Sequence, residues 1–250
     1  PHVAFDASGA SDVEQLSSDA ISPGVESEPA EEAEPVEKIL PEQSPVIPDP
    51  YFFVGGTKHS FLPEGGDCAG AENCTVSTTP IQDALNVVSG GLTPDDGTIY
   101  IEGGIYTEDV SISNFANLTL QGSANGSTSI LSGNVEIHNS QAINLYNFIF
   151  EEVLQIADAD EVSIVGTDGD DEIEVAVEGV VDNLSVDGAA GNDTITINQN
   201  ADSSTVKVDG GSGDDELTVN ATADADQITQ ESNSGPPPKK WTVRKAKSTL

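Results

Sequence analysis

Between Gln155 and Glu231 the hydrophobic and polar positions follow an 11-residue repeat that recurs seven times without an insertion. The eighth and tenth positions of each unit are apolar, apart from Gln230, and the seventh and ninth are polar. This period-2 alternation is typical of a half-buried β-strand. Each unit therefore predicts one short strand and one turn, and the fixed period predicts a solenoid. The apolar positions are Val162, Ile164, Ile173, Val175, Leu184, Val186, Ile195, Ile197, Val206, Val208, Leu217, Val219 and Ile228.

The turns of alternate units differ. Glycine opens every second unit and recurs three residues later, at Gly166 and Gly169, Gly188 and Gly191, and Gly210 and Gly213. The true period is therefore 22 residues. One coil of this period contains two strands and two turns.

The glycine-bearing turns GTDGDDEIE, GAAGNDTIT and GGSGDDELT resemble the calcium-binding nonapeptide G-G-x-G-x-D-x-U-x of RTX (haemolysin-type) proteins. The segment Gly210–Thr218 matches at every position, whereas Thr167 and Ala189 replace the second glycine in the other two turns. RTX repeats carry such turns on both edges of a β-roll, but the intervening turns of this chain lack the glycines. The resemblance therefore implies Ca²⁺ on one edge only.

A separate electrostatic argument also favours a cation at these turns. Stacked coils lie ~4.8 Å apart, and like charges at ~4 Å repel by ~1 kcal/mol in water and by ~4 kcal/mol at an effective dielectric of 20. A hard cation that takes oxygen ligands would cancel this repulsion. The alternative is ordinary Gly-Asp turn chemistry with carboxylates in solvent. The predicted Ca²⁺-site residues are Gly166, Asp168, Asp170, Asp171, Gly188, Asn192, Asp193, Gly210, Gly213, Asp214 and Asp215.

A short amphipathic helix is predicted before the strands. Thr79-Pro80-Ile81-Gln82 has the pattern of a capping box with proline at the first helical position. Ile81, Leu85 and Val88 recur at helical spacing, and Gly90-Gly91 ends the helix.

The stretch that follows, DDGTIYIEGGIYTEDVSISNFANLTLQG, resembles the first coils of the pectin-lyase-like right-handed parallel β-helix in its order of strands and turns. The resemblance covers about residues 75–156 and implies that the helix caps the open end of the first coil. Further strands are expected at VSIS, NLTLQ, SILSG, NVEIHN, AINLYNFIF and VLQIA. The expected fold class is all-β, a right-handed parallel β-helix or β-solenoid with a short N-terminal capping helix.

Composition changes divide the chain into four predicted segments. They are an acidic Pro-rich linker (1–50), a cap and β-helix (51–156), the repeat solenoid (157–231) and a basic tail (232–250). In the tail, WTVRKA alternates like a strand, which would pair over the last coil or onto an acidic neighbouring subunit. Charge complementarity between this end and the acidic body favours head-to-tail association into a homo-oligomer or fibre.

The charge balance excludes several partners and favours a location outside the cell. With 44 acidic and 8 basic residues the formal net charge is −36, which argues against binding nucleic acid or anionic membranes. No apolar run is long enough to span a bilayer. Cys68 and Cys74 are close enough to form a disulfide ring, which such a chain favours over a metal site. We expect a secreted or cell-surface protein, of bacterial origin.

The residues argue against catalysis. Calcium-dependent lyases of the β-helix family use an Arg or Lys base, but Lys207 is the one basic residue between Thr75 and Gly235. The hydrolases use clustered Asp residues with a nearby His, and His138 stands alone in the body of the chain. We expect a non-catalytic structural or adhesive surface protein that calcium stabilises. A fragment of a polysaccharide lyase or hydrolase is the alternative, and a glycan or surface receptor stays open as a partner.

Overall fold

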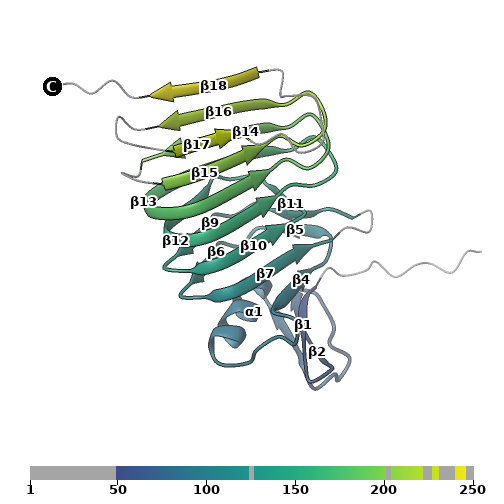
Figure 1. Cartoon of the computed structure of the whole chain (residues 1–250). Coiled ribbons are helices and arrows are strands. Elements are labelled where there is room, and N and C mark those ends of the chain that lie inside the picture. The colour runs from purple at the N-terminus through teal and green to yellow at the C-terminus, as the bar shows by residue number, and fades with distance from the viewer. Residues whose placement is uncertain (1–48, 124–126, 201–203, 222–226, 231–239, 246–250) are drawn as a thin grey trace, which may run out of the picture. The chain divides into compact units, whose positions relative to one another are not determined.

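From residue 98 onward, parallel strands from successive coils stack on one another (Figure 1). The computed structural model describes residues 49–123, 127–200, 204–221, 227–230 and 240–245. These residues belong to one compact unit, Pro45–Leu250, and build a parallel β-solenoid of about five turns. The expected acidic linker lies outside the described residues except for Asp49 and Pro50.

One face of the solenoid is formed by parallel strands that pair in sequence order, each with its equivalent in the next coil. Strands β12 and β13 reach this face with their second halves, since both bend around a corner of the coil. The strands are β4 (Thr98–Ile101), β7 (Ala116–Gly122), β10 (Gln141–Tyr146), β12 (Leu154–Val165), β13 (Glu172–Asp187), β15 (Ser204–Asp209) and β17 (Gln227–Gln230).

A second face is built in the same way and includes the first halves of β12 and β13. Its other strands are β6 (Val110–Ser113), β9 (Val135–His138), β14 (Thr194–Gln199), β16 (Glu216–Ala221) and β18 (Lys240–Lys245). Strand β18 lies in the predicted basic tail and pairs in parallel with β16. Within the predicted WTVRKA segment, residues 241–245 therefore do form a strand on the last described coil.

A third, smaller sheet closes only the earlier coils. It consists of β5 (Gly104–Tyr106), β8 (Ser129–Leu131) and β11 (Phe148–Phe150). The predicted continuous strand AINLYNFIF is wrong, because Asn147 adopts a left-handed conformation (φ 64°) and turns the chain from β10 to β11. Its side-chain amide donates to the Ser123 carbonyl of the previous coil, which holds this corner in place.

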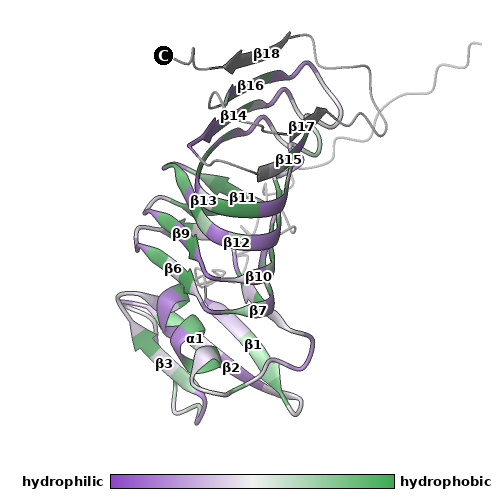
Figure 2. Ribbon diagram, turned by 60° about the vertical axis from the view of Figure 1, so that its left-hand side comes forward, coloured by the Kyte–Doolittle hydropathy of each residue, from purple (hydrophilic) through white to green (hydrophobic). Residues whose placement is uncertain are grey.

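The interior is filled by the apolar positions of the repeat, as the alternation predicts. Figure 2 shows hydrophobic and hydrophilic residues alternating along the stacked strands. From Val162 to Val219, each predicted inward side chain is at most 1% exposed. Ile228 and Gln230 lie in β17, whose side chains are outside the description. The repeat pattern thus predicted the core of the second half residue by residue.

A hairpin, which the sequence did not predict, covers the edge of β4. Strand β1 (Pro50–Val54) pairs antiparallel with β4 and with β2 (Thr57–Pro63), and β3 (Cys74–Ser77) pairs in parallel with β2. Cys68 and Cys74 form a disulfide with a Cα–Cα distance of 5.5 Å. An antiparallel strand on β4 ends the parallel stack at this side, so its backbone groups are paired.

Helix α1 (Pro80–Ser89) packs against the hairpin and β6 through Ile81, Ala84 and Leu85, which are fully buried. The predicted capping box is wrong, because the Thr79 side chain makes no capping hydrogen bond. The carboxylate of Glu108 replaces it and accepts the amides of Ile81 (2.9 Å) and Gln82 (2.8 Å). An anion is favourable at a helix N-terminus, yet burial raises the pKa of Glu108 above its usual value.

We expect Glu108→Ala to lower the free energy of unfolding by about 2 kcal/mol, because one buried and one partly buried helix amide lose their acceptor. Urea unfolding followed by circular dichroism measures this. Glu64→Ala, at an exposed glutamate beyond β2, is the control and should change stability by less than about 0.5 kcal/mol. Equal midpoints for the two variants would show that Glu108 does not anchor the helix.

Candidate metal-binding turns

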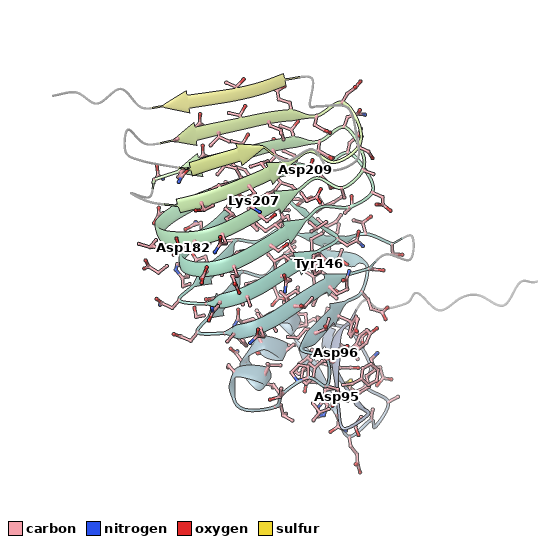
Figure 3. All side chains as sticks on the ribbon, viewed as in Figure 1. Asp95, Asp96, Tyr146, Asp182, Lys207 and Asp209 are labelled. Carbon is pink, nitrogen blue, oxygen red and sulfur yellow. A yellow bond between two sulfur atoms is a disulfide. The ribbon has the colours of Figure 1, made fainter. Side chains whose placement is uncertain are left out.

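The Gly-Asp turns lie where the third sheet ends. In the earlier coils the chain passes from the first face through β5, β8 or β11 to the second face. In the later coils the segments 166–171, 188–193 and 210–215 make the same passage without a strand. Figure 3 places Asp209, which precedes the last of these turns, and Asp182 at opposite edges of the solenoid. The three turns therefore stack on one edge.

Three aspartates from these turns form a buried row. Asp171, Asp193 and Asp215 are 5%, 1% and 2% exposed. The Asp171 amide donates to Oδ1 of Asp193 (2.9 Å), and the Asp193 amide donates to Oδ1 of Asp215 (3.1 Å). Oδ2 of Asp193 and Oδ2 of Asp215 are buried and have no hydrogen-bond partner. We call these three residues the inner row.

A second, exposed row consists of Asp170, Asn192 and Asp214. The Asn192 amide donates to Oδ1 of Asp170 (2.7 Å), and the Asp214 amide donates to Oδ1 of Asn192 (3.0 Å). The expected site residues include both of these neighbours in each turn. The structure divides them into two rows, because consecutive residues point to opposite sides of an extended chain. Asp168 is also exposed and lies outside the inner row.

Glycine at the first turn position makes room for the inner row. A β-carbon at Gly188 would lie 2.4 Å from Oδ2 of Asp193 and 2.7 Å from the Gly210 carbonyl oxygen. A β-carbon at Gly166 would lie 2.6 Å from Oδ2 of Asp171, and one at Gly210 would lie 2.5 Å from Oδ2 of Asp215. Each inner carboxylate thus packs so closely on the first glycine of its turn that a side chain there would clash. A carbonyl oxygen of the next turn also lies close, from Gly188 at Gly166 (2.9 Å) and from Gly210 at Gly188 (2.7 Å).

The environment disfavours a bare negative charge on the inner row. Burial raises the pKa of Asp193 to about 6, and the nearby Asp171, Asp215 and Asp170 carboxylates act in the same direction. The hydrogen bond from the Asp171 amide opposes this shift. Burial likewise raises the pKa of Asp171. A bound cation would relieve the cost of these buried charges.

Three further residues, which the sequence analysis did not assign to the site, decide the hydrogen bonding of the turns. Asp187 and Asp209 accept the amides of Ala189 (2.9 Å) and Gly211 (3.0 Å) through Oδ1. Thr167 donates its own amide to Oδ2 of Asp171 at 2.6 Å. The repeat itself marks two of these residues. Asp187 and Asp209 occupy the last position of the 11-residue unit before their turn, where the unit before the first turn has Val165.

The donor set fits a hard, oxygen-binding cation. Buried carboxylate oxygens without partners and a turn carbonyl close to the inner row are the ligand types that Ca²⁺ takes. Among the described residues, no group of three or more His, Cys, Asp or Glu side chains is arranged to hold a metal. A cation at these turns would therefore depend on backbone carbonyls for much of its coordination.

An open groove of about 510 Å³ lies between the end of β11 and the first Gly-Asp turn. Its charged lining residues are all acidic, namely Glu151, Glu152, Asp170, Glu172 and Glu174. Elsewhere, His138 lies on β9 and contacts Oε2 of Glu136 at 3.3 Å. Lys207 lies on β15, on the face shown in Figure 3.

No family model, curated protein or solved structure matches the chain. In the parts of the chain that the structure describes, no helix has the length and hydropathy needed to cross a membrane.

Proposed function

We propose that this chain is a non-catalytic extracellular β-solenoid with a structural or adhesive role, and that Ca²⁺ at its Gly-Asp turns stabilises it. The observation that carries the proposal is the pair of buried, partnerless oxygens on Asp193 and Asp215. A folded protein seldom leaves a buried carboxylate oxygen unpaired. The fit of the last turn to the RTX nonapeptide supports the same assignment.

In finer detail, the proposed architecture is a right-handed, pectin-lyase-like β-helix that continues into RTX-like coils, with α1 as the cap of its first coil. The burial of Ile81 and Leu85 beneath the hairpin supports the capping role. The carboxylates of the groove beside β11 would repel an acidic polysaccharide, which argues against a lyase that acts on such substrates.

Calcium would act on folding. Without a cation, stacking the later coils buries the inner-row carboxylates at an electrostatic cost. Binding energy at these turns would then become folding energy, so the coils would be stable where Ca²⁺ is abundant. Such a protein would be secreted as a poorly stable chain and would gain its full stability outside the cell.

Thermal unfolding in Ca²⁺ and in chelator tests the proposal. Free Ca²⁺ at 100 times its Kd should add about 2.7 kcal/mol, which raises the midpoint by roughly 5–10 °C. Asp193→Asn should abolish this increment. Asp182→Asn, at an exposed aspartate on the opposite edge, should retain it. An equal midpoint of the wild type in Ca²⁺ and in chelator would overturn the calcium assignment.

We also propose that chains associate head to tail. Strand β18 carries basic positions onto the last described coil of a strongly acidic protein. Association driven by this complementarity should weaken with salt, because exposed charges are screened over about 10 Å at 0.1 M. Light scattering should therefore give a larger mass at 20 mM salt than at 500 mM salt, and replacing the basic residues of 240–245 by Ser should remove the difference. A monomeric wild type at low salt would contradict this.

A further inference from the structure

The amide of the second residue in each Gly-Asp turn is satisfied in two different ways. In the second and third turns the preceding aspartate accepts it, through Asp187 Oδ1 and Asp209 Oδ1. In the first turn the equivalent preceding residue is Val165, whose side chain has no hydrogen-bond acceptor. The Thr167 amide bonds instead to Oδ2 of Asp171.

This difference fixes the state of the inner carboxylate. In the first turn the Thr167 hydroxyl lies 3.0 Å from Oδ2 and 3.1 Å from Oδ1 of Asp171, so it can donate to Oδ1 while the Thr167 amide donates to Oδ2. Both oxygens of Asp171 therefore have partners within the turn. In the second turn Ala189 offers no hydroxyl and its amide is already bound to Asp187, so Oδ2 of Asp193 has no partner.

The interval between the second and third turns is held by direct backbone bonds. The Gly191 amide donates to the Ser212 carbonyl (3.0 Å), and the Ser212 amide donates to the Ala189 carbonyl (2.9 Å). In the same interval Oδ2 of Asp193 and the Gly210 carbonyl oxygen both lie close to Gly188, at 2.4 and 2.7 Å from the position that its β-carbon would take. Two oxygens of the kind that bind a hard cation therefore lie near each other at this interval.

We propose that Val165 and Thr167 close the first turn to cations, whereas Asp187 keeps the second turn open, so that a cation binds at Asp193 between the second and third turns. The inference rests on the proposed calcium function. The proposal is a rule: the residue before the first glycine of a turn and the residue after it together decide whether a cation is bound.

Reciprocal exchange of these two positions tests the rule. V165D/T167A gives the first turn the residues of the second, and D187V/A189T gives the second turn those of the first. The number of Ca²⁺ ions bound per chain is measured by equilibrium dialysis and titration calorimetry. We expect V165D/T167A to bind one ion more than the wild type and D187V/A189T to bind one fewer.

The controls separate this inference from the proposed function. Thr167→Ser keeps a hydroxyl and should bind as the wild type does. Circular dichroism in chelator checks that each variant folds, and D187V/A189T should melt at a higher temperature than the wild type there, because Asp193 gains partners. Ca²⁺ binding by the wild type with unchanged ion numbers in both exchanges would overturn the rule alone. No Ca²⁺ binding by the wild type would overturn the calcium function itself.

Discussion

Gly213→Ala should be the most damaging single substitution in the repeat region, with an expected loss of more than about 3 kcal/mol in the free energy of unfolding. A β-carbon at Gly213 would lie 1.6 Å from the Gly191 carbonyl oxygen of the previous turn. Gly213 also has a φ of 149°, which side-chain-bearing residues rarely adopt. The neighbouring atom belongs to backbone that stacks on the same turn, so it cannot move aside cheaply.

The equivalent glycine of the first turn supplies a matched control. A β-carbon at Gly169 would meet only Oγ1 of Thr167, at 3.6 Å, because no glycine turn stacks on that side of it. Gly169→Ala should therefore change stability by less than about 1 kcal/mol. Both variants are compared with the wild type by urea unfolding in Ca²⁺ and in chelator. A similar loss in the two variants would mean that the stacking of turns does not constrain Gly213.

The second large effect is a pH dependence whose sign depends on calcium. In the folded, calcium-free protein the pKa of Asp193 is about 6, against an ordinary value of 3.8. A raised pKa means that the folded state binds more protons than the unfolded state between these values, so stability falls as pH rises through this window. In chelator the wild type should be roughly 1–2 kcal/mol more stable at pH 5 than at pH 7.5 through this group alone.

Asp193→Asn isolates this contribution. Asparagine keeps an oxygen for the Asp171 amide and has no charge to bury, so the variant in chelator should be more stable than the wild type at pH 7.5. Its stability should also change less between pH 5 and pH 7.5. In Ca²⁺ the wild-type trend should reverse, because protons compete with the ion for the carboxylates. A wild-type slope in chelator equal to that of the variant would rule out Asp193 as the titrating group.

The alternation of the repeat predicted which side chains fill the core, from Val162 to Val219, because in a strand the side-chain direction follows from position alone. Helix α1 could also be predicted, because the helical spacing of Ile81 and Leu85 is visible in the local sequence. The Gly-Asp turns could be located on one edge by their 22-residue period.

Contacts between distant parts of the chain could not be predicted in this way. Glu108 reaches the first turn of α1 from a segment 26 and 27 residues further along the chain, so the local capping pattern at Thr79 was misleading. Which amide each carboxylate accepts, such as the Asp171 amide at Asp193, depends on how one turn stacks on the next. The role of Thr167 depends on the absence of an acceptor at Val165, which becomes visible only when hydrogen bonds are traced.

The hydrogen bonds of the inner row have a consequence for the length of the protein. In each of them a backbone amide donates to the carboxylate one coil further along the chain, from Asp171 to Asp193 and from Asp193 to Asp215. In a duplicated 22-residue coil, the amide would donate to the carboxylate of the coil after it, and the carboxylate would accept the amide of the coil before it. The inner-row hydrogen bonds of both neighbouring coils would therefore be kept. A duplicated 11-residue unit would instead place a strand of one face on the other and break the row. Copy number in this region can therefore vary only in whole coils, and the stack can be lengthened or shortened without redesigning its remaining parts.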